Sequence, residues 1–130
     1  MTRRLGLALC VLAGASDTVT GALLLAAPRM TLDLMRAGDP VSELIWMRYL
    51  GAFVLAVGLL HGYGLARRGP RLAPLMEATA LLRAVIAAFT GAAVIAGALS
   101  TAWLLVTATD GAVALAQIIA LRTGAFDHED

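Results

Sequence analysis

Four long apolar stretches, separated by short polar segments, set the pattern of this chain. Each is long enough to form a helix across the ~30 Å hydrocarbon core of a membrane. The stretches are residues 5–27, 44–66, 72–98 and 100–121. The segment 28–43 mixes charged residues with methionine and leucine, so a short helix at the membrane surface is expected there. The pattern predicts an all-α fold, an integral membrane antiparallel four-helix bundle that forms a single domain over residues 1–130.

The first stretch has a competing interpretation as a cleaved signal peptide. Arg3 and Arg4 would form its basic region, residues 5–12 its apolar region and residues 13–15 its cleavage site. Hydrophobicity resumes over residues 21–27, which favours a helix that stays in the membrane.

The composition supports a membrane protein and excludes several other classes. The chain is 60% hydrophobic and 15% charged, which is too apolar for an ordinary soluble domain of 130 residues. A net charge of +1 argues against a nucleic acid partner. Cys10 is the single cysteine, and no Cys/His cluster has the spacing of a zinc site. We therefore expect neither a metal nor a cofactor.

Arginines are concentrated in the segments that the bundle would place on one side of the membrane. That side holds Arg3, Arg4, Arg67, Arg68, Arg71 and Arg122, and the other side holds Arg29 and Arg36. Because cytoplasmic loops carry the excess of positive charge, both termini are predicted to be cytoplasmic. The expected location is a bacterial inner membrane, with several passes.

Three ionisable residues fall at one level, near the middle of the predicted bilayer. Asp17 lies 12 residues from Leu5, Arg83 lies 11 from Leu72, and Asp110 lies 11 from Leu121. At 1.5 Å per residue each is about 17 Å deep. Arginine stays charged in proteins, so Arg83 should face the bundle interior and bind the two aspartates. Two interpretations stay open, a buried ion-pair network that fixes helix register and a functional site.

The charge balance of this trio favours a functional site over a purely structural ion-pair network. Two carboxylates share one guanidinium, so a proton shared between Asp17 and Asp110 would form an acid/base pair beside a fixed cation. An Asp-Arg-Asp set looks like the catalytic set of limonene-epoxide-hydrolase-type enzymes, as an analogy of chemistry without similarity of fold. The leading hypothesis is a membrane enzyme, a hydrolase or isomerase, that opens an epoxide or cyclises or isomerises an apolar small molecule. One aspartate would be the acid and the other the base, with Arg83 positioning both.

Other polar residues extend the candidate site. His61, Glu77 and Gln117 form a second predicted layer nearer the cytoplasm, and Arg48 lies at the outer end of its span. Residues near helix ends can reach interfacial water, so a structural role is favoured for this layer and for Arg48. Trp103, Thr107 and Gln117 share the helix stripe of Asp110. The predicted binding residues are thus Arg48, His61, Glu77, Trp103, Thr107 and Gln117.

Small residues predict close helix packing. Gly58 and Gly62 form a GxxxG pair, and Ala93 and Gly97 a second small pair. They would serve either contacts within the bundle or a homodimer through glycine faces.

The runs 47–58 (MRYLGAFVLAVG) and 81–83 (LLR) resemble the DoxX-like group of small four-helix bacterial membrane proteins. This resemblance implies the four-span fold and a link to membrane oxidoreductases, and it assigns no catalytic residue. Two further functions stay open. A proton-coupled small multidrug transporter also has four spans and an embedded acid in the first, although its third-span Trp-Gly motif is missing and Arg83 would repel cationic drugs. A non-catalytic accessory subunit would use the trio structurally.

Overall fold

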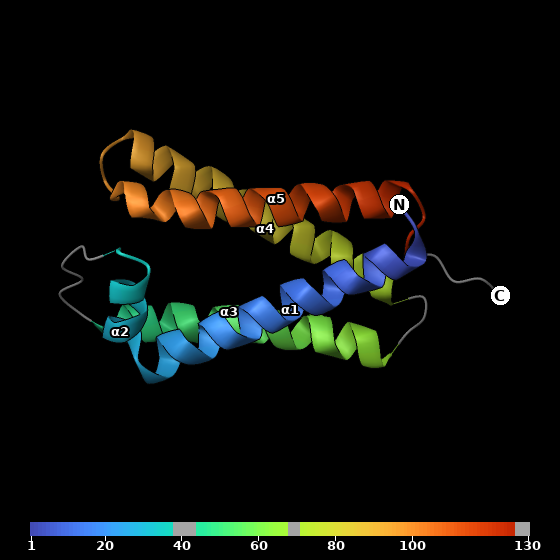
Figure 1. Cartoon of the computed structure of the whole chain (residues 1–130), viewed down its shortest axis with the longest axis horizontal. Helices are drawn as coiled ribbons and strands as arrows, with labels where there is room; N and C mark the ends of the chain where they lie inside the picture. Colours follow the sequence, from blue (N-terminus) through green and yellow to red (C-terminus); the bar gives the residue numbers. More distant parts are fainter. Residues whose placement is uncertain (38–43, 68–70, 127–130) are drawn as a thin grey trace.

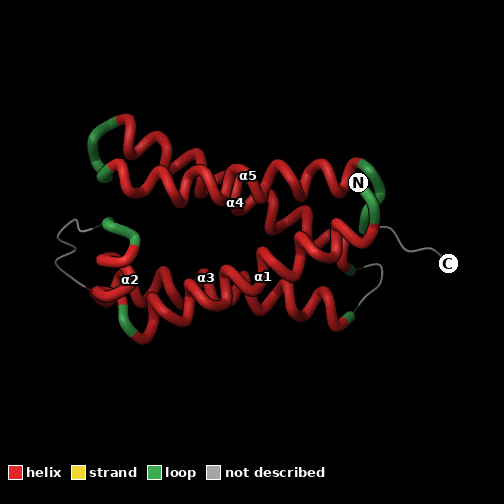
Figure 2. Tube along the Cα trace, viewed as in Figure 1, coloured by secondary structure: helices red, strands yellow, loops and turns green. Residues whose placement is uncertain are grey.

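The computed structural model describes residues 1–37, 44–67 and 71–126, and every regular element among these residues is helical (Figure 2). The all-α prediction is therefore confirmed. The helices are α1 Arg3–Ala26, α2 Pro28–Leu34, α3 Leu44–Ala66, α4 Leu72–Ile95 and α5 Leu104–Arg122, with a 3₁₀ turn, η1 Thr101–Trp103, before α5. Four of them, with η1 counted into the last, are long and apolar enough to cross a membrane.

Glycines end two of the long helices. Gly97 adopts a φ of 72°, and the N–H of Ala98 donates to the Ala93 carbonyl at 2.9 Å. This is the Schellman arrangement, which glycine favours because it lacks a Cβ. The predicted span to residue 98 is therefore too long, since α4 ends at Ile95. Gly97 lies outside the helix, so the predicted small-residue pair with Ala93 is wrong. Gly124 ends α5 in the same way, with a φ of 67°.

The helices associate as two pairs. α1 packs along α3, and α4 packs along α5, whereas contacts between the pairs are sparse. Figure 1 shows the pairs meeting near the first residues of α1 and diverging toward the end that carries α2. Pro28 begins α2, where its missing N–H costs nothing. This confirms a short helix within segment 28–43, while its place at a membrane surface stays a prediction.

A seam of glycines brings α1 and α3 into close contact. Gly14 and Gly21 on α1 face Gly51 and Gly58 on α3. A Cβ added at Gly14 would lie 2.6 Å from the His61 Cβ, and one at Gly51 would lie 2.7 Å from the Leu24 Cβ. Neither position has room for a side chain, so the two backbones lie in direct contact. Gly62 has no atom within 4 Å of its added Cβ, so the predicted Gly58–Gly62 pair does not form one contact face.

Side chains at the end where the pairs meet form a small apolar core. Its buried members are Cys10, Leu72, Met76, Ala120, Ala125 and Phe126. Large apolar side chains elsewhere point outward, among them Val19, Leu81, Val85 and Leu105. Away from this core, many bulky apolar residues of the long helices therefore face the surroundings.

Candidate functional site

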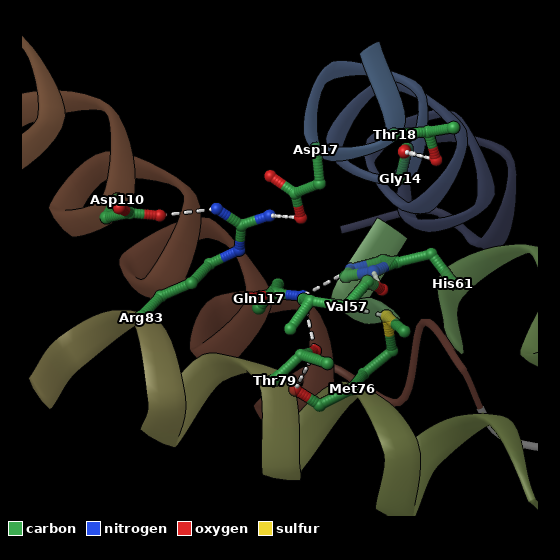
Figure 3. A network of polar contacts seen from close by, with 10 residues as sticks. All are labelled: Gly14, Asp17, Thr18, Val57, His61, Met76, Thr79, Arg83, Asp110 and Gln117. Carbon is green, nitrogen blue, oxygen red and sulfur yellow. Dashed lines mark hydrogen bonds and ion pairs between the residues drawn. The ribbon is translucent and has the colours of Figure 1, made fainter. Parts of the chain in front are cut away.

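Arg83 bridges two aspartates that come from two other helices. Its Nη1 donates to Asp110 Oδ1 on α5 at 2.5 Å, and its Nη2 donates to Asp17 Oδ2 on α1 (Figure 3). The three side chains are 7%, 16% and 13% exposed for Arg83, Asp110 and Asp17. The predicted contact is confirmed, while the catalytic roles of these residues stay predictions.

The geometry leaves part of each carboxylate free of the bridge. Asp17 Oδ1 and Asp110 Oδ2 make no hydrogen bond with another of the described residues. Arg83 Nε is buried and has no partner among these residues either. Among the described residues, the ion pairs join two carboxylates to one guanidinium, so one negative charge is in excess. A proton shared by the aspartates would balance it and provide both an acid and a base.

A cavity of about 470 Å³ opens from this trio toward the α2 end. Asp17, Arg83 and Asp110 all line it. Most of the remaining wall is apolar and comes from every long helix, with Leu32 and Met35 from the α2 region. The volume is within the range of small-molecule sites, which combine apolar walls with a few polar groups. The polar members besides the trio are Ser16, Thr20, Thr90 and Thr109.

A second polar cluster closes the opposite side of the trio. Gln117 Nε2 donates to Thr79 Oγ1 at 3.0 Å and lies 3.4 Å from His61 Nε2. His61 Nδ1 lies 2.9 Å from the Val57 carbonyl, which can only accept, so this nitrogen carries the proton and Nε2 accepts from Gln117. His61 and Gln117 are both fully buried. The structure brings these two predicted residues together, but outside the cavity.

Two predicted binding residues lie elsewhere. Glu77 is exposed and points away from the His61–Gln117 cluster, because it follows the fully buried Met76 by about 100° around α4. Within the described ranges it makes no ion pair with Arg67 or Arg71. Arg48 is also exposed and does not line the cavity. The structure therefore places Glu77 and Arg48 away from the cavity, and their binding roles stay predictions.

Trp103 and Thr107 lie near the first residues of α5, before Asp110 in the chain. Trp103 lines the cavity, and Thr107 Oγ1 lies 2.8 Å from Thr90 Oγ1, which lines it. Thr90 was missing from the predicted binding residues, although its spacing of seven from Arg83 places both on one face of α4. Ser16 and Thr20 lie close to Asp17 in the sequence and also line the cavity. The sequence alone does not predict this, because it does not determine how α1 is rotated about its axis.

The side chains of this site are better suited to transferring protons than to binding a metal ion. Among residues 1–37, 44–67 and 71–126, no three His, Cys, Asp or Glu side chains lie close enough to hold a metal ion. Asp17 and Asp110 instead share the guanidinium between them. No model of a known protein family matches the chain, and neither a curated protein nor a solved structure is similar to it.

Proposed function

We propose that the chain is a multi-pass protein of a bacterial inner membrane, folded as an antiparallel four-helix bundle with both termini in the cytoplasm. The support is the outward-facing bulky apolar residues of the long helices, which suit lipid, and the small residues at the α1–α3 seam. Arginine asymmetry supports the orientation. Exposed arginines at the end where the pairs meet, including Arg3, Arg4 and Arg122, would lie at the cytoplasmic surface.

Within that membrane we propose an acid/base enzyme that acts on a lipid-soluble small molecule. One observation carries this proposal: both aspartates and the arginine line the inner end of a largely apolar cavity. A purely structural ion-pair network has no need of a ligand-sized space beside it. The substrate class we favour is an epoxide or another molecule whose single oxygen needs a proton during the reaction.

The chemistry can be written for epoxide opening. One protonated aspartate donates its proton to the epoxide oxygen as the C–O bond breaks. The other aspartate accepts a proton from a water molecule whose oxygen forms the new bond to the ring carbon. The product is a diol, and the proton now held by the second aspartate returns to the first before the next turnover. Arg83 holds both carboxylates in place throughout, and in an isomerisation the same pair would remove and return a proton.

The test is turnover of apolar epoxides by purified protein in lipid vesicles, with ¹⁸O-labelled water to follow the new bond. We expect Asp17→Asn and Asp110→Asn each to lower the rate by about 10²–10⁴-fold, the usual contribution of a positioned acid or base. Asp33→Asn is the matched control, since Asp33 is exposed on α2. Melting temperatures of the same preparations separate lost chemistry from lost fold.

Two results would decide against the enzyme. If the Asp→Asn variants remain active, these aspartates do not act as the acid and the base. If turnover in these variants falls only as far as the amount of folded protein falls, the trio has a structural role, as in the accessory-subunit alternative.

A transporter is the second candidate, because the cavity extends from the trio toward one end only. The His61–Gln117 cluster lies on the other side of the trio (Figure 3). A one-sided cavity suits alternating access. Proton-driven uptake of an apolar compound by vesicles that show no turnover would favour this function. The DoxX-like resemblance and a homodimer through glycine faces stay predictions under either function.

A further inference from the structure

The cavity is charged at one end, and most of its wall beyond that end is apolar. The trio occupies the inner end, while Trp103 lines the cavity seven residues from Asp110 along α5. Seven residues of helix correspond to about 10 Å. Between these levels the wall includes Leu50, Val54 and Ile86. A ligand that matches this wall has one polar group at the end of an elongated apolar body.

The two ends of the cavity differ. The inner end is closed by the trio, and behind it lies the fully buried pair His61 and Gln117. At the other end α2 contributes Leu32, which is 5% exposed and lines the cavity. Exposed lining residues on the long helices show that the cavity also reaches the surroundings between the helix pairs.

The gap between α3 and α4 is the apolar opening. These helices touch near the inner end, where Gly64 faces Leu72 and Leu75, and they separate beyond it (Figure 1). Phe89 on α4 lines the cavity although 69% of its surface is exposed. One side of this residue therefore borders the cavity and the other borders the surroundings.

The gap between α1 and α5 has a different character. Ser16 on α1 and Thr109 on α5 both line the cavity and are exposed. These hydroxyls make this opening polar, whereas Phe89 makes the α3–α4 opening apolar. Of these two openings, the α3–α4 opening is the one that matches an apolar molecule dissolved in lipid.

We propose that the substrate is a membrane-dissolved amphiphile with one terminal oxygen, and that it enters sideways from the lipid between α3 and α4 past Phe89. This inference rests on the proposed function, to which it adds the substrate class and the route. Its test measures binding rather than turnover, so the two can fail separately.

The probe is bromo-octanol, whose bromine quenches indole fluorescence. In a Trp46→Phe background Trp103 is the single tryptophan, and it lines the cavity. A cysteine introduced by Phe89→Cys is alkylated with cyclohexylmaleimide to fill the opening. Val85→Cys is the matched control, because Val85 lies one turn away on α4, is 59% exposed and does not line the cavity. Both variants retain Cys10, which is fully buried.

We expect saturable quenching of Trp103 in vesicles. Alkylation at position 89 should slow its onset by about tenfold or more, equivalent to ~1.4 kcal/mol of added barrier. Alkylation at position 85 should leave the rate unchanged. Absence of saturable quenching in the Trp46→Phe protein would overturn the substrate class. Equal rates before and after alkylation at position 89, or equal slowing at both positions, would overturn the route.

Discussion

The glycine seam between α1 and α3 provides the sharpest test of the fold. A Cβ added at Gly58 would lie 2.5 Å from the Thr18 backbone nitrogen and 2.9 Å from the Gly14 carbonyl oxygen. Both atoms belong to the α1 backbone, which cannot rotate aside as a side chain can. Gly58→Ala therefore forces the two helices apart.

The size of the effect follows from two opposing contributions. Overpacking of a tight interface costs about 1–3 kcal/mol. Alanine improves helix propensity over glycine by at most ~1 kcal/mol, and by less if the helix persists in the unfolded state. We expect a net loss of about 1–2 kcal/mol for Gly58→Ala. Gly62→Ala adds its Cβ with no atom within 4 Å, so its unfolding free energy should stay level or rise slightly.

The assay is thermal unfolding in one detergent, with both variants prepared in parallel. A loss of this size should lower the Tm of Gly58→Ala by several degrees, since ~1 kcal/mol corresponds to about 2–8 °C for chains of roughly this length. Gly62→Ala should melt with the unsubstituted protein. Equal Tm values for the two variants would refute the close contact between α1 and α3.

Two further predictions concern the inner cluster and the orientation. Gln117→Leu should lower the unfolding free energy by about 1–3 kcal/mol, because His61 Nε2 loses its hydrogen-bond donor in a fully buried place. Glu77→Gln, at an exposed site, should leave it unchanged, and equal effects would contradict a buried role for Gln117. In intact cells a membrane-impermeant maleimide should label a cysteine at Asp33 and fail to label one at Arg71 until the cells are lysed. The reverse pattern would overturn the predicted orientation.

Helix class and the level of each charge could be predicted because both depend on local properties. α3 spans Leu44–Ala66, as the apolar stretch indicates. A helix rises 1.5 Å per residue, so residue number converts to depth once the spans run alongside one another. The sequence therefore predicts that Asp17, Arg83 and Asp110 lie at one level.

The direction in which a side chain points could not be predicted in the same way. The long helices are apolar on all sides, so hydrophobicity marks no inner face. Glu77 lies at the depth of His61 but faces outward. The GxxxG pair misleads similarly: Gly58 and Gly62 differ by about 40° around the helix, whereas seven residues return to within ~20°. The seam uses this second spacing, at Gly14 and Gly21 and at Gly51 and Gly58.

The cavity exists because the two helix pairs diverge, and Arg83 joins the pairs where this divergence begins. Asp110 and Arg83 belong to the α4–α5 pair, while Asp17 belongs to the α1–α3 pair. Among the described residues, Arg83–Asp17 is therefore the one ion pair that joins the two pairs. Asp17→Asn weakens a link between pairs, and Asp110→Asn weakens a link within a pair. If both aspartates carry protons in catalysis, the two substitutions should reduce turnover alike while Asp17→Asn costs more thermal stability. A turnover loss that instead follows the stability loss would mean that the trio acts by holding the pairs together.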